Sequence, residues 1–203
     1  AKTFGKHDVS AIVGFEAYDY HYRTSSMSKN HFSNSILSEF NNIVDMSSIT
    51  GSYSSYSTAA LFGRASYAYD GRYMAEVNFR YDGSSRFASE SRWGFFPSVS
   101  AAWTISNMGF MESTRSWLDE LRVRASYGVT GREAASDYAS LSTYNSKGSN
   151  YYMDGQWVPG YGISRNPNPN LGWETAVVDN YGVDFELLDR RLTGSIEYFD
   201  RRS

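Results

Sequence analysis

Apolar side chains recur at every second position along much of this 203-residue chain. Between residues 121 and 129, the odd positions are apolar and the even positions carry two arginines, a serine and a glycine. Residues 73–82 and 95–106 alternate in the same way. Because successive side chains of a β-strand point to opposite faces, a period of two predicts strands with one apolar face and one polar or small-residue face.

Weaker alternation extends this pattern to seven candidate strands. They span residues 8–20, 61–69, 73–82, 95–106, 121–129, 173–187 and 192–199. Asp70-Gly71, between the second and third of them, is a dipeptide typical of a tight hairpin turn. A Ser- and Asn-rich stretch at 23–55 and a second stretch at 130–172 are expected to form long loops at one end of the sheet. The shorter turns fall at the other end, and the apolar spacing at 107–120 suits a short helix there.

An antiparallel sheet with one apolar face, one charged face and such loops is typical of a transmembrane β-barrel, whose apolar face meets lipid. Aromatic residues near the strand ends would then form girdles at the two membrane interfaces. The candidates are Tyr67, Tyr69, Tyr73, Tyr81, Trp103, Tyr127 and Tyr198. A soluble β-sandwich or single-core sheet is the alternative, because Tyr-rich alternating strands also build lectins and adhesins. The pattern alone leaves both folds open.

Composition excludes several other classes of protein. The chain is 17% aromatic and 41% hydrophobic, so it can bury a large apolar surface and is not a disordered segment. Its 22 acidic and 19 basic residues give no positive field that would collect nucleic acid. It has no cysteine, which excludes disulfides, thiol catalysis and thiolate metal sites. No segment approaches the ~18–20 consecutive apolar residues that a membrane-spanning helix needs.

The two ends of the sequence lack the signals of a complete chain. The first residues contain no initiator Met and no basic and apolar regions of a signal peptide. The last strand-like segment stops at Ser203 without a turn after it. We therefore expect both ends to lie inside a longer polypeptide.

No group of residues has the spacing of a catalytic, nucleotide or metal site. His7, His21 and His31 are scattered, and the Gly-x-Ser-x-Gly, P-loop and Gly-x-Gly-x-x-Gly motifs are absent. We predict that the chain is not an enzyme and holds neither a metal nor a cofactor.

Acidic residues in the last third of the chain have two interpretations. The candidates for the paired carboxylates of a glycosidase are Asp179, Glu174, Asp184 and Glu186. On the strand pattern, however, Glu174, Asp184 and Glu186 lie on the polar face of the sheet. The same face carries Arg80, Arg122 and Arg124, and we expect the acids to pair with these arginines across neighbouring strands in the lumen of a barrel. The predicted lumen-facing charges are Arg80, Arg122, Arg124, Glu174, Asp184 and Glu186.

Three segments resemble a known family. Residues 78–87 read NFRYDGSSRF and are followed by RWGFFPS at 92–98, a signature of SusC/RagA-type TonB-dependent outer-membrane transporters. Residues 118–131, LDELRVRASYGVTG, and residues 168–175, NPNLGWET, are similar to later segments of the same family. Arg132 stands where Asn is usual, and Gly172 stands where Lys is common. The resemblance runs from about residue 62 to residue 200.

The resemblance implies an all-β fold: an antiparallel transmembrane β-barrel portion with about seven to eight strands of a larger, 22-stranded barrel. Residues 1–203 would be part of one β-barrel domain, with the family's plug domain and the C-terminal barrel strands absent. Seven strands is an odd number for a single-chain bacterial barrel, and open edges are costly in lipid. The remaining strands must therefore come from elsewhere.

Two loops carry further candidate residues. Arg86 and Arg92 lie in the loop at 83–94, where they either pair locally with Asp82 and Glu90 or contact the plug. A second loop, at 150–161, is unusually aromatic. Its planar rings suit stacking on sugars or peptide groups, and packing against a partner protein or a neighbouring loop is the alternative. The candidate contact residues are Tyr151, Tyr152, Trp157 and Tyr161.

The family resemblance implies a transport function. Such proteins import oligomeric nutrients, oligosaccharides or peptides, through the outer membrane of Gram-negative, Bacteroidetes-like bacteria. A SusD-like surface lipoprotein forms a lid, and the TonB complex pulls on the plug. The alternative is a small self-contained β-barrel or a lectin-like binding or adhesion module. An outer-membrane hydrolase would need a catalytic set that the sequence does not show.

Overall fold

A single antiparallel sheet dominates the computed structural model, which describes residues 1–32, 43–133, 136–146 and 151–203, without side chains at 29–32 and 43–47. Within these residues the sheet has eight strands, and their order in space follows their order in the chain. The strands are β1 (Lys2–Phe4), β2 (His7–Phe32), β3 (Ile43–Tyr69), β4 (Tyr73–Ser84), β5 (Trp93–Thr104), β6 (Leu118–Arg132), β11 (Glu174–Leu187) and β12 (Leu192–Arg202). All seven predicted strands are present, and β1 is an addition.

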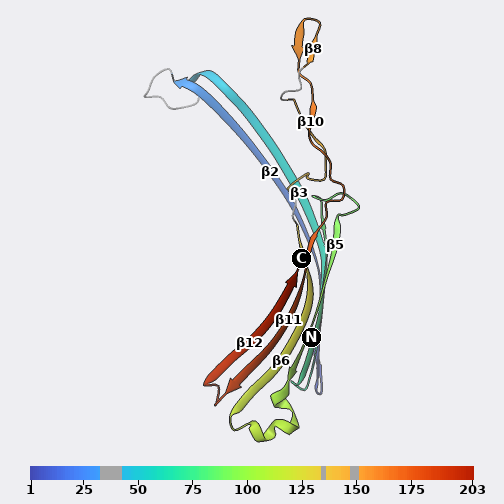
Figure 1. The fold of residues 1–203 in the computed structure, drawn as a ribbon, viewed down its shortest axis with the longest axis vertical. Coiled ribbons are helices and arrows are strands. Elements are labelled where there is room, and N and C mark those ends of the chain that lie inside the picture. The colour runs from blue at the N-terminus through green and yellow to red at the C-terminus, as the bar shows by residue number, and fades with distance from the viewer. Residues whose placement is uncertain (33–42, 134–135, 147–150) are drawn as a thin grey trace.

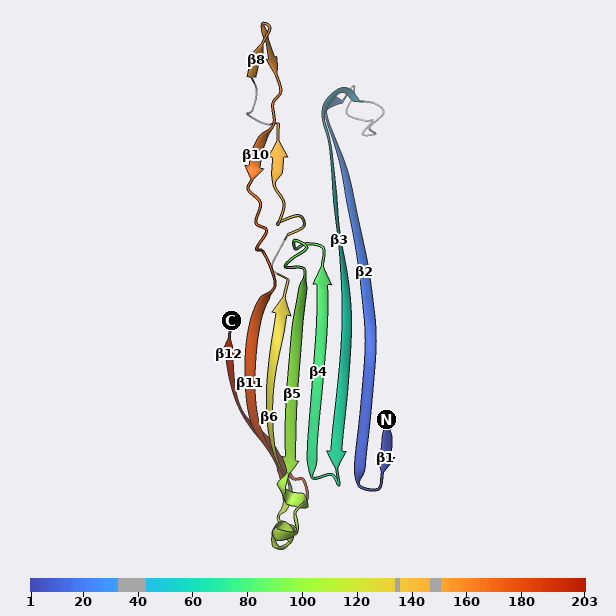
Figure 2. The same cartoon turned by 90° about the vertical axis from the view of Figure 1, so that its right-hand side faces the viewer.

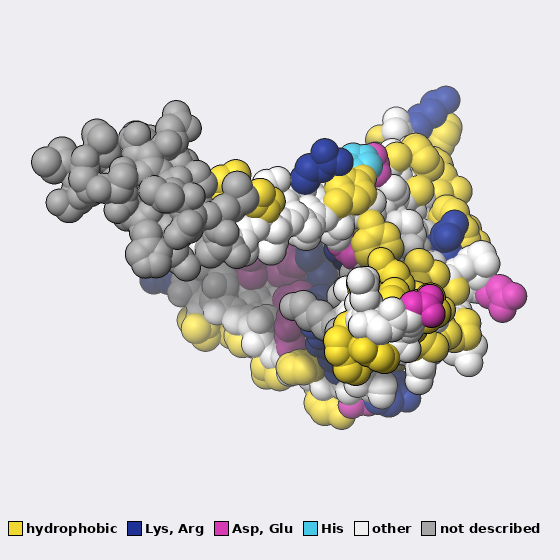
Figure 3. Space-filling view, turned by 90° about the horizontal axis from the view of Figure 1, so that it is seen from above, with side chains coloured by type: hydrophobic (Ala, Val, Ile, Leu, Met, Phe, Trp, Pro, Cys, Tyr) yellow, Lys and Arg dark blue, Asp and Glu magenta, His cyan; other side chains and the backbone are white. Residues whose placement is uncertain are grey.

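The sheet is curved, and its two faces differ in chemistry (Figures 1 and 3). The register places apolar residues opposite one another across strands, as in Ala101 beside Ala125 and Trp103 beside Val123. This apolar face is convex and strongly exposed, with Val13 at 71% and Ile196 at 69% of their accessible surface. Charged side chains gather on the concave face (Figure 3). Because one layer leaves its apolar face uncovered, the described part of the chain lacks the packed second layer of a sandwich.

One predicted loop is wrong. β2 and β3 continue through most of the Ser- and Asn-rich stretch at 23–55, pairing from His7 beside Tyr69 as far as Phe32 beside Ile43. The strands persist because Thr and Tyr favour extended backbone and because hydroxyl side chains pair across them; Thr24 Oγ1 and Ser52 Oγ lie 2.5 Å apart. Residues 18–32 of β2 and 43–58 of β3, which extend from the end of β4 outward, are called the ribbon below (Figure 2). Residues 33–42 lie outside the described residues.

Short turns gather at one end of the sheet, the turn end, and long connections at the other, the loop end (Figure 2). At the turn end, Asp70 and Gly71 have φ angles of 52° and 61°, as the predicted tight hairpin turn requires. The β5–β6 connection, where a short helix was expected, forms two short 3-10 helices, η2 (Ile105–Asn107) and η3 (Gly109–Thr114). None of the described helices is long and apolar enough to cross a membrane.

The connection between β6 and β11 is long, as expected, and contains small sheets of its own. β7 (Thr143–Asn145) pairs with β10 (Gly162–Arg165), and β8 (Tyr151–Met153) pairs with β9 (Gln156–Val158). These four strands project beyond the loop end of the main sheet (Figures 1 and 2). The segment 143–165 is called the arm below.

Candidate functional site

Ion pairs between neighbouring strands line the concave face. Arg124 lies between Asp184, at 3.2 Å, and Glu197 on the next strand. Arg80 on β4 reaches Glu16 on β2 across the intervening strand β3, at 3.1 Å. These side chains are about one-third to one-half exposed, so water and salt screen the pairs and each adds little to the stability of the sheet. The main effect of these ion pairs is to make the concave face hydrophilic and balanced in charge.

The predicted pairing of the concave charges is correct in one case and wrong in others. Asp184 pairs with Arg124 as expected. Glu186 instead contacts Arg190 of the adjoining turn, at 3.0 Å, and Arg122 pairs with Glu120 on its own strand. Arg80 binds Asp82 at 2.8 Å in addition to Glu16. Glu174 lies opposite Arg132 in the register, and no ion pair joins it to another described residue. Residues two apart on one strand share a face, so these local partners compete with the cross-strand ones.

The same face is hollowed near the turn end. Small side chains from β2 to β6 form the floor of this hollow, with three polar groups on its side. The floor and polar residues include Ser66, Ala68, Ser100, Ala102, Ser126, Glu76, Arg124 and Asn180. Small residues at these positions leave room for a body that packs against the concave face.

Aromatic rings on the convex face form two rows, one near each end of the sheet. Near the turn end, Tyr73 stacks on Trp103 with ring centroids 6.3 Å apart. Near the loop end, Tyr81 stacks on Trp93 at 5.0 Å. All seven residues predicted as girdle members lie on this convex face in the strand register. Such paired rows flank the lipid-facing band of membrane barrels.

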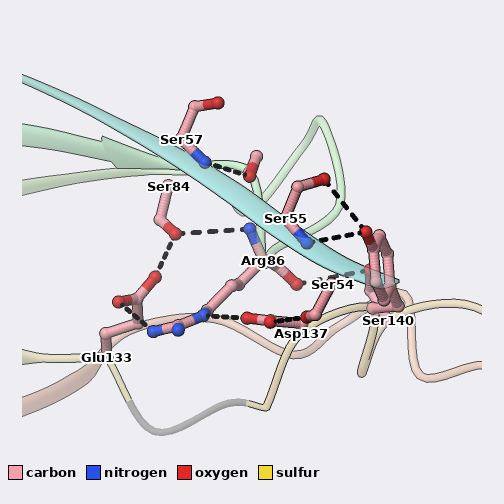
Figure 4. Close-up of polar contacts among 10 residues, drawn as sticks. Ser54, Ser55, Ser57, Ser84, Arg86, Glu133, Asp137 and Ser140 are labelled. Atoms are coloured by element: carbon pink, nitrogen blue, oxygen red, sulfur yellow. Dashed lines mark hydrogen bonds and ion pairs between the residues drawn. The ribbon is translucent and has the colours of Figure 1, made fainter. Parts of the chain in front are cut away.

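A cluster around Arg86 ties several segments together at the loop end (Figure 4). The Arg86 guanidinium donates to Glu133 at 2.8 Å and to Asp137 at 2.7 Å. It also lies 3.7 Å from the ring centroid of Tyr56 on the ribbon. The Arg86 side chain is only 21% exposed, so both ion pairs are shielded from water. This group of residues, with Ser54 and Ser84, is called the Arg86 cluster below.

Hydroxyl groups and aromatic rings complete this connection. Ser84, at the end of β4, is buried and donates to Glu133, while Ser54 of the ribbon donates to Asp137. Phe87, which follows Arg86 in the chain, is 1% exposed and packs on Trp173. Trp173 lies at the far end of the β6–β11 connection, just before β11. The ribbon, the β4–β5 loop and both ends of the β6–β11 connection therefore meet at one place.

The predicted local pairing in the loop at 83–94 is wrong. Arg86 binds carboxylates that lie 47 and 51 residues later in the chain, and Asp82 binds Arg80. Arg92 contributes its backbone carbonyl, which accepts a hydrogen bond from Trp173 Nε1 at 3.1 Å. The short turn after Ser84 aims Arg86 at the next connection rather than at Glu90.

The Arg86 cluster is expected to open only in acid. Hydrogen bonds from Ser54 and then from Arg86 hold the pKa of Asp137 below its ordinary value of 3.8. A lowered pKa in the folded state means that this stabilisation is present above the unfolded pKa and is lost as the pH falls through the folded pKa. Amide exchange of residues 136–141, corrected for the intrinsic pH dependence, should therefore stay constant from pH 7 to 5 and rise below about pH 4. In Asp137→Asn, exchange should already be fast at neutral pH and this acid step should vanish.

The four predicted aromatic contact residues lie on the arm. Tyr152 and Trp157 sit opposite each other across β8 and β9, with ring centroids 5.4 Å apart. Tyr151, Tyr152, Trp157 and Tyr161 are 50–78% exposed. The rings are therefore presented outward instead of packing into the sheet.

A second aromatic surface, which the sequence did not predict, lies on the ribbon. Tyr18, Tyr20 and Tyr22 form a row on the ribbon, on the same face as the concave charges, and Tyr56 lies beside them. Their spacing of two residues was the available signal. The predicted loop at 23–55 conceals this signal, because it ends the expected strand at Tyr20.

The described residues contain no group of three or more His, Asp or Glu side chains that could hold a metal ion. His7 and His21 hydrogen-bond to tyrosines instead. His31 lies where side chains are not described.

A curved single-layer sheet, apolar outside and ion-paired inside, with aromatic rows at both ends, defines part of a transmembrane β-barrel.

Comparison with known proteins identifies the family. The model of the TonB-dependent receptor-like β-barrel family matches residues 2–203. The chain therefore belongs to this family, which consists of outer-membrane receptors and transporters rather than enzymes.

Curated relatives and solved structures agree with this assignment. TonB-dependent receptor P39 of Formosa agariphila is 33% identical over 201 residues, which cover 98% of this chain and 19% of that protein. TonB-dependent receptor SusC of Bacteroides thetaiotaomicron is 35% identical over 147 residues, 70% of this chain and 14% of SusC. The RagAB peptide transporter structure matches with a TM-score of 0.85 at 29% identity, covering 98% of this chain and 22% of that one.

The chain thus spans about a fifth of the length of the first curated relative. The predicted resemblance to SusC/RagA-type transporters is confirmed, and so is the antiparallel transmembrane barrel portion. The β-sandwich alternative is excluded.

Proposed function

We propose that this chain forms part of the wall and extracellular loops of a transporter that imports oligomeric nutrients, oligosaccharides or peptides. The observation that supports this most directly is the contrast between the exposed apolar convex face and the ion-paired concave face. In a membrane barrel the apolar convex face contacts lipid, and the ion-paired concave face lines a water-filled lumen. The proposed location is the outer membrane of a Gram-negative, Bacteroidetes-like bacterium, in line with relatives from Formosa and Bacteroides.

The six charged residues predicted for the lumen fit this proposal. Arg80, Arg122, Arg124, Glu174, Asp184 and Glu186 share the face of the sheet that carries the ion pairs. Their charges are largely paired, so the proposed lumen wall is polar without a strong field of one sign. The hollow of small residues suits a plug domain that packs inside the barrel and links it to the TonB complex. That domain would be supplied outside residues 1–203.

The arm is proposed to contact the ligand or a SusD-like lipoprotein lid. It projects from the loop end, which faces the cell exterior in membrane barrels because long loops gather there. Its four outward aromatic rings are the side chains that most often anchor interfaces. The RagAB peptide transporter matches this chain in fold.

Replacing Trp157 and Tyr161 by Ala in the complete transporter tests this role. Each truncated aromatic anchor is expected to cost about 1–3 kcal/mol, so lid binding or uptake should weaken tenfold or more. Binding to the isolated lipoprotein and uptake by whole cells are the measurements. Trp157→Phe and Tyr161→Phe keep the rings and should retain most of the activity.

Folding of the barrel is the control, followed by heat-modifiable migration on gels. Loss of the folded form would show that the arm packs structurally and has no contact role. Normal assembly with unchanged uptake and unchanged lid binding would exclude Trp157 and Tyr161 as contacts and overturn the proposed role of the arm.

A further inference from the structure

Large apolar side chains are exposed at the turn end, most of them outside the strands. Phe110 in η3 is 65% exposed and Trp117, just before β6, is 49% exposed. In the neighbouring β11–β12 turn, Leu188 and Leu192 are 54% and 52% exposed. The sequence predicted a short helix in this connection, but a helix alone gives these residues no place to bury their surface. Their exposure calls for a partner.

Contacts place this connection beside the convex face. The Tyr73 hydroxyl lies 3.8 Å from Met108 Sδ, and Tyr73 itself belongs to the convex aromatic row. Asn107 Nδ2 donates to the Gly71 carbonyl of the β3–β4 turn, at 2.9 Å. These contacts fix the start of the connection below the aromatic row.

The far end of the connection is fixed in the same way. The Leu188 amide donates to the Trp117 carbonyl, at 2.9 Å, so Trp117 lies against the β11–β12 turn. Leu192 begins β12 opposite Leu187, on the convex face. Both ends of the connection therefore adjoin the lipid-facing surface of the barrel, at Tyr73 and at Leu192.

We propose that the segment 108–117 lies in the membrane interface at the turn end and anchors the barrel rim to that leaflet. Phe110 and Trp117 enter the boundary between head groups and acyl chains. Glu112 and Arg115, which are exposed on the same segment, remain in water. Trp is favoured at this depth because its ring is apolar while its N–H reaches polar groups. The partner is the bilayer, because the segment continues a surface that already meets lipid.

This inference rests on the barrel fold and not on the transported solute. Site-directed spin labelling of the complete transporter, freed of other cysteines and reconstituted in phospholipid vesicles, tests it. A nitroxide is placed at position 110 or 117, and in matched variants at position 112 or 115. Collision with oxygen, which concentrates in lipid, is compared with collision with a water-soluble nickel complex.

Labels at 110 and 117 should show an oxygen-to-nickel collision ratio severalfold higher than labels at 112 and 115. Equal ratios at all four positions, with high nickel access, would place the segment in water and overturn the proposal. Protection of 110 and 117 from both reagents would mean that protein covers them, which also overturns it. Uptake measured on the same variants keeps this result separate from the transport proposal, since failed transport leaves the collision ratios unchanged.

Discussion

Arginine at position 125 is expected to destabilise the folded barrel by about 2–4 kcal/mol, the cost of a cation near the bilayer midplane. Ala125 lies on the convex face between Ala101 and Tyr181, in the apolar part of the register. An arginine there must hold its guanidinium in lipid or bend the strand to reach water. The measurement is the urea midpoint for folding of the complete transporter into vesicles.

The substitution Thr130→Arg on the same strand is the matched control. Thr130 is exposed on the concave face of β6, outside the hollow of small residues. In water the added charge should shift the folding midpoint little. Equal destabilisation by both arginines, or a harmless Ala125→Arg, would show that the convex face does not meet lipid.

Arg86→Ala is expected to loosen the loop end by about 3 kcal/mol, because removing one partner strands the shielded carboxylates of Glu133 and Asp137. This value is at the low end for buried pairs, since the cluster is about one-fifth exposed. Amide exchange of residues 85–91 and 136–141 should accelerate by about two orders of magnitude, while the strands between the aromatic rows stay protected.

Two variants show whether the geometry of Arg86 matters. Arg86→Lys keeps the charge but loses the fork that reaches both carboxylates, so its exchange should lie between wild type and Arg86→Ala. Arg92 lies in the same loop, and no ion pair joins it to another described residue, so Arg92→Ala should change the exchange of residues 136–141 little. Similar acceleration in the alanine variants of both arginines would mean that the loop responds to any lost charge.

The sheet was predictable because its information is local. Alternation with a period of two assigns each residue of β4, β5 and β6 to a face without knowledge of its partners, and Asp70-Gly71 marks a turn within the chain itself. The ribbon was not predictable by the same route. Ser and Asn are typical of loops, and only pairing with the opposite strand shows that Thr24 and Ser52 form a ladder.

The site was less predictable than the sheet for a related reason. The pair Arg124–Asp184 could be inferred from the sharing of one face by adjacent strands. The partners of Arg86 could not be inferred in this way, because Glu133 and Asp137 lie in an irregular connection without alternation. They approach Arg86 through a turn whose direction depends on packing. Phe87 and Trp173 supply that packing, and they lie 86 residues apart in the sequence.

The order of the strands has a consequence for biogenesis. From β1 to β12, each strand of the sheet pairs with the strands next to it along the chain, and the arm is a detour that returns to the same place. Every strand can therefore enter the bilayer as one half of a hairpin whose other half is already synthesised. Unpaired amides are costly in hydrocarbon, so stepwise addition of hairpins keeps only the growing edge unsatisfied. The local connectivity lets the wall grow in the order in which the polypeptide arrives, with few long-range searches.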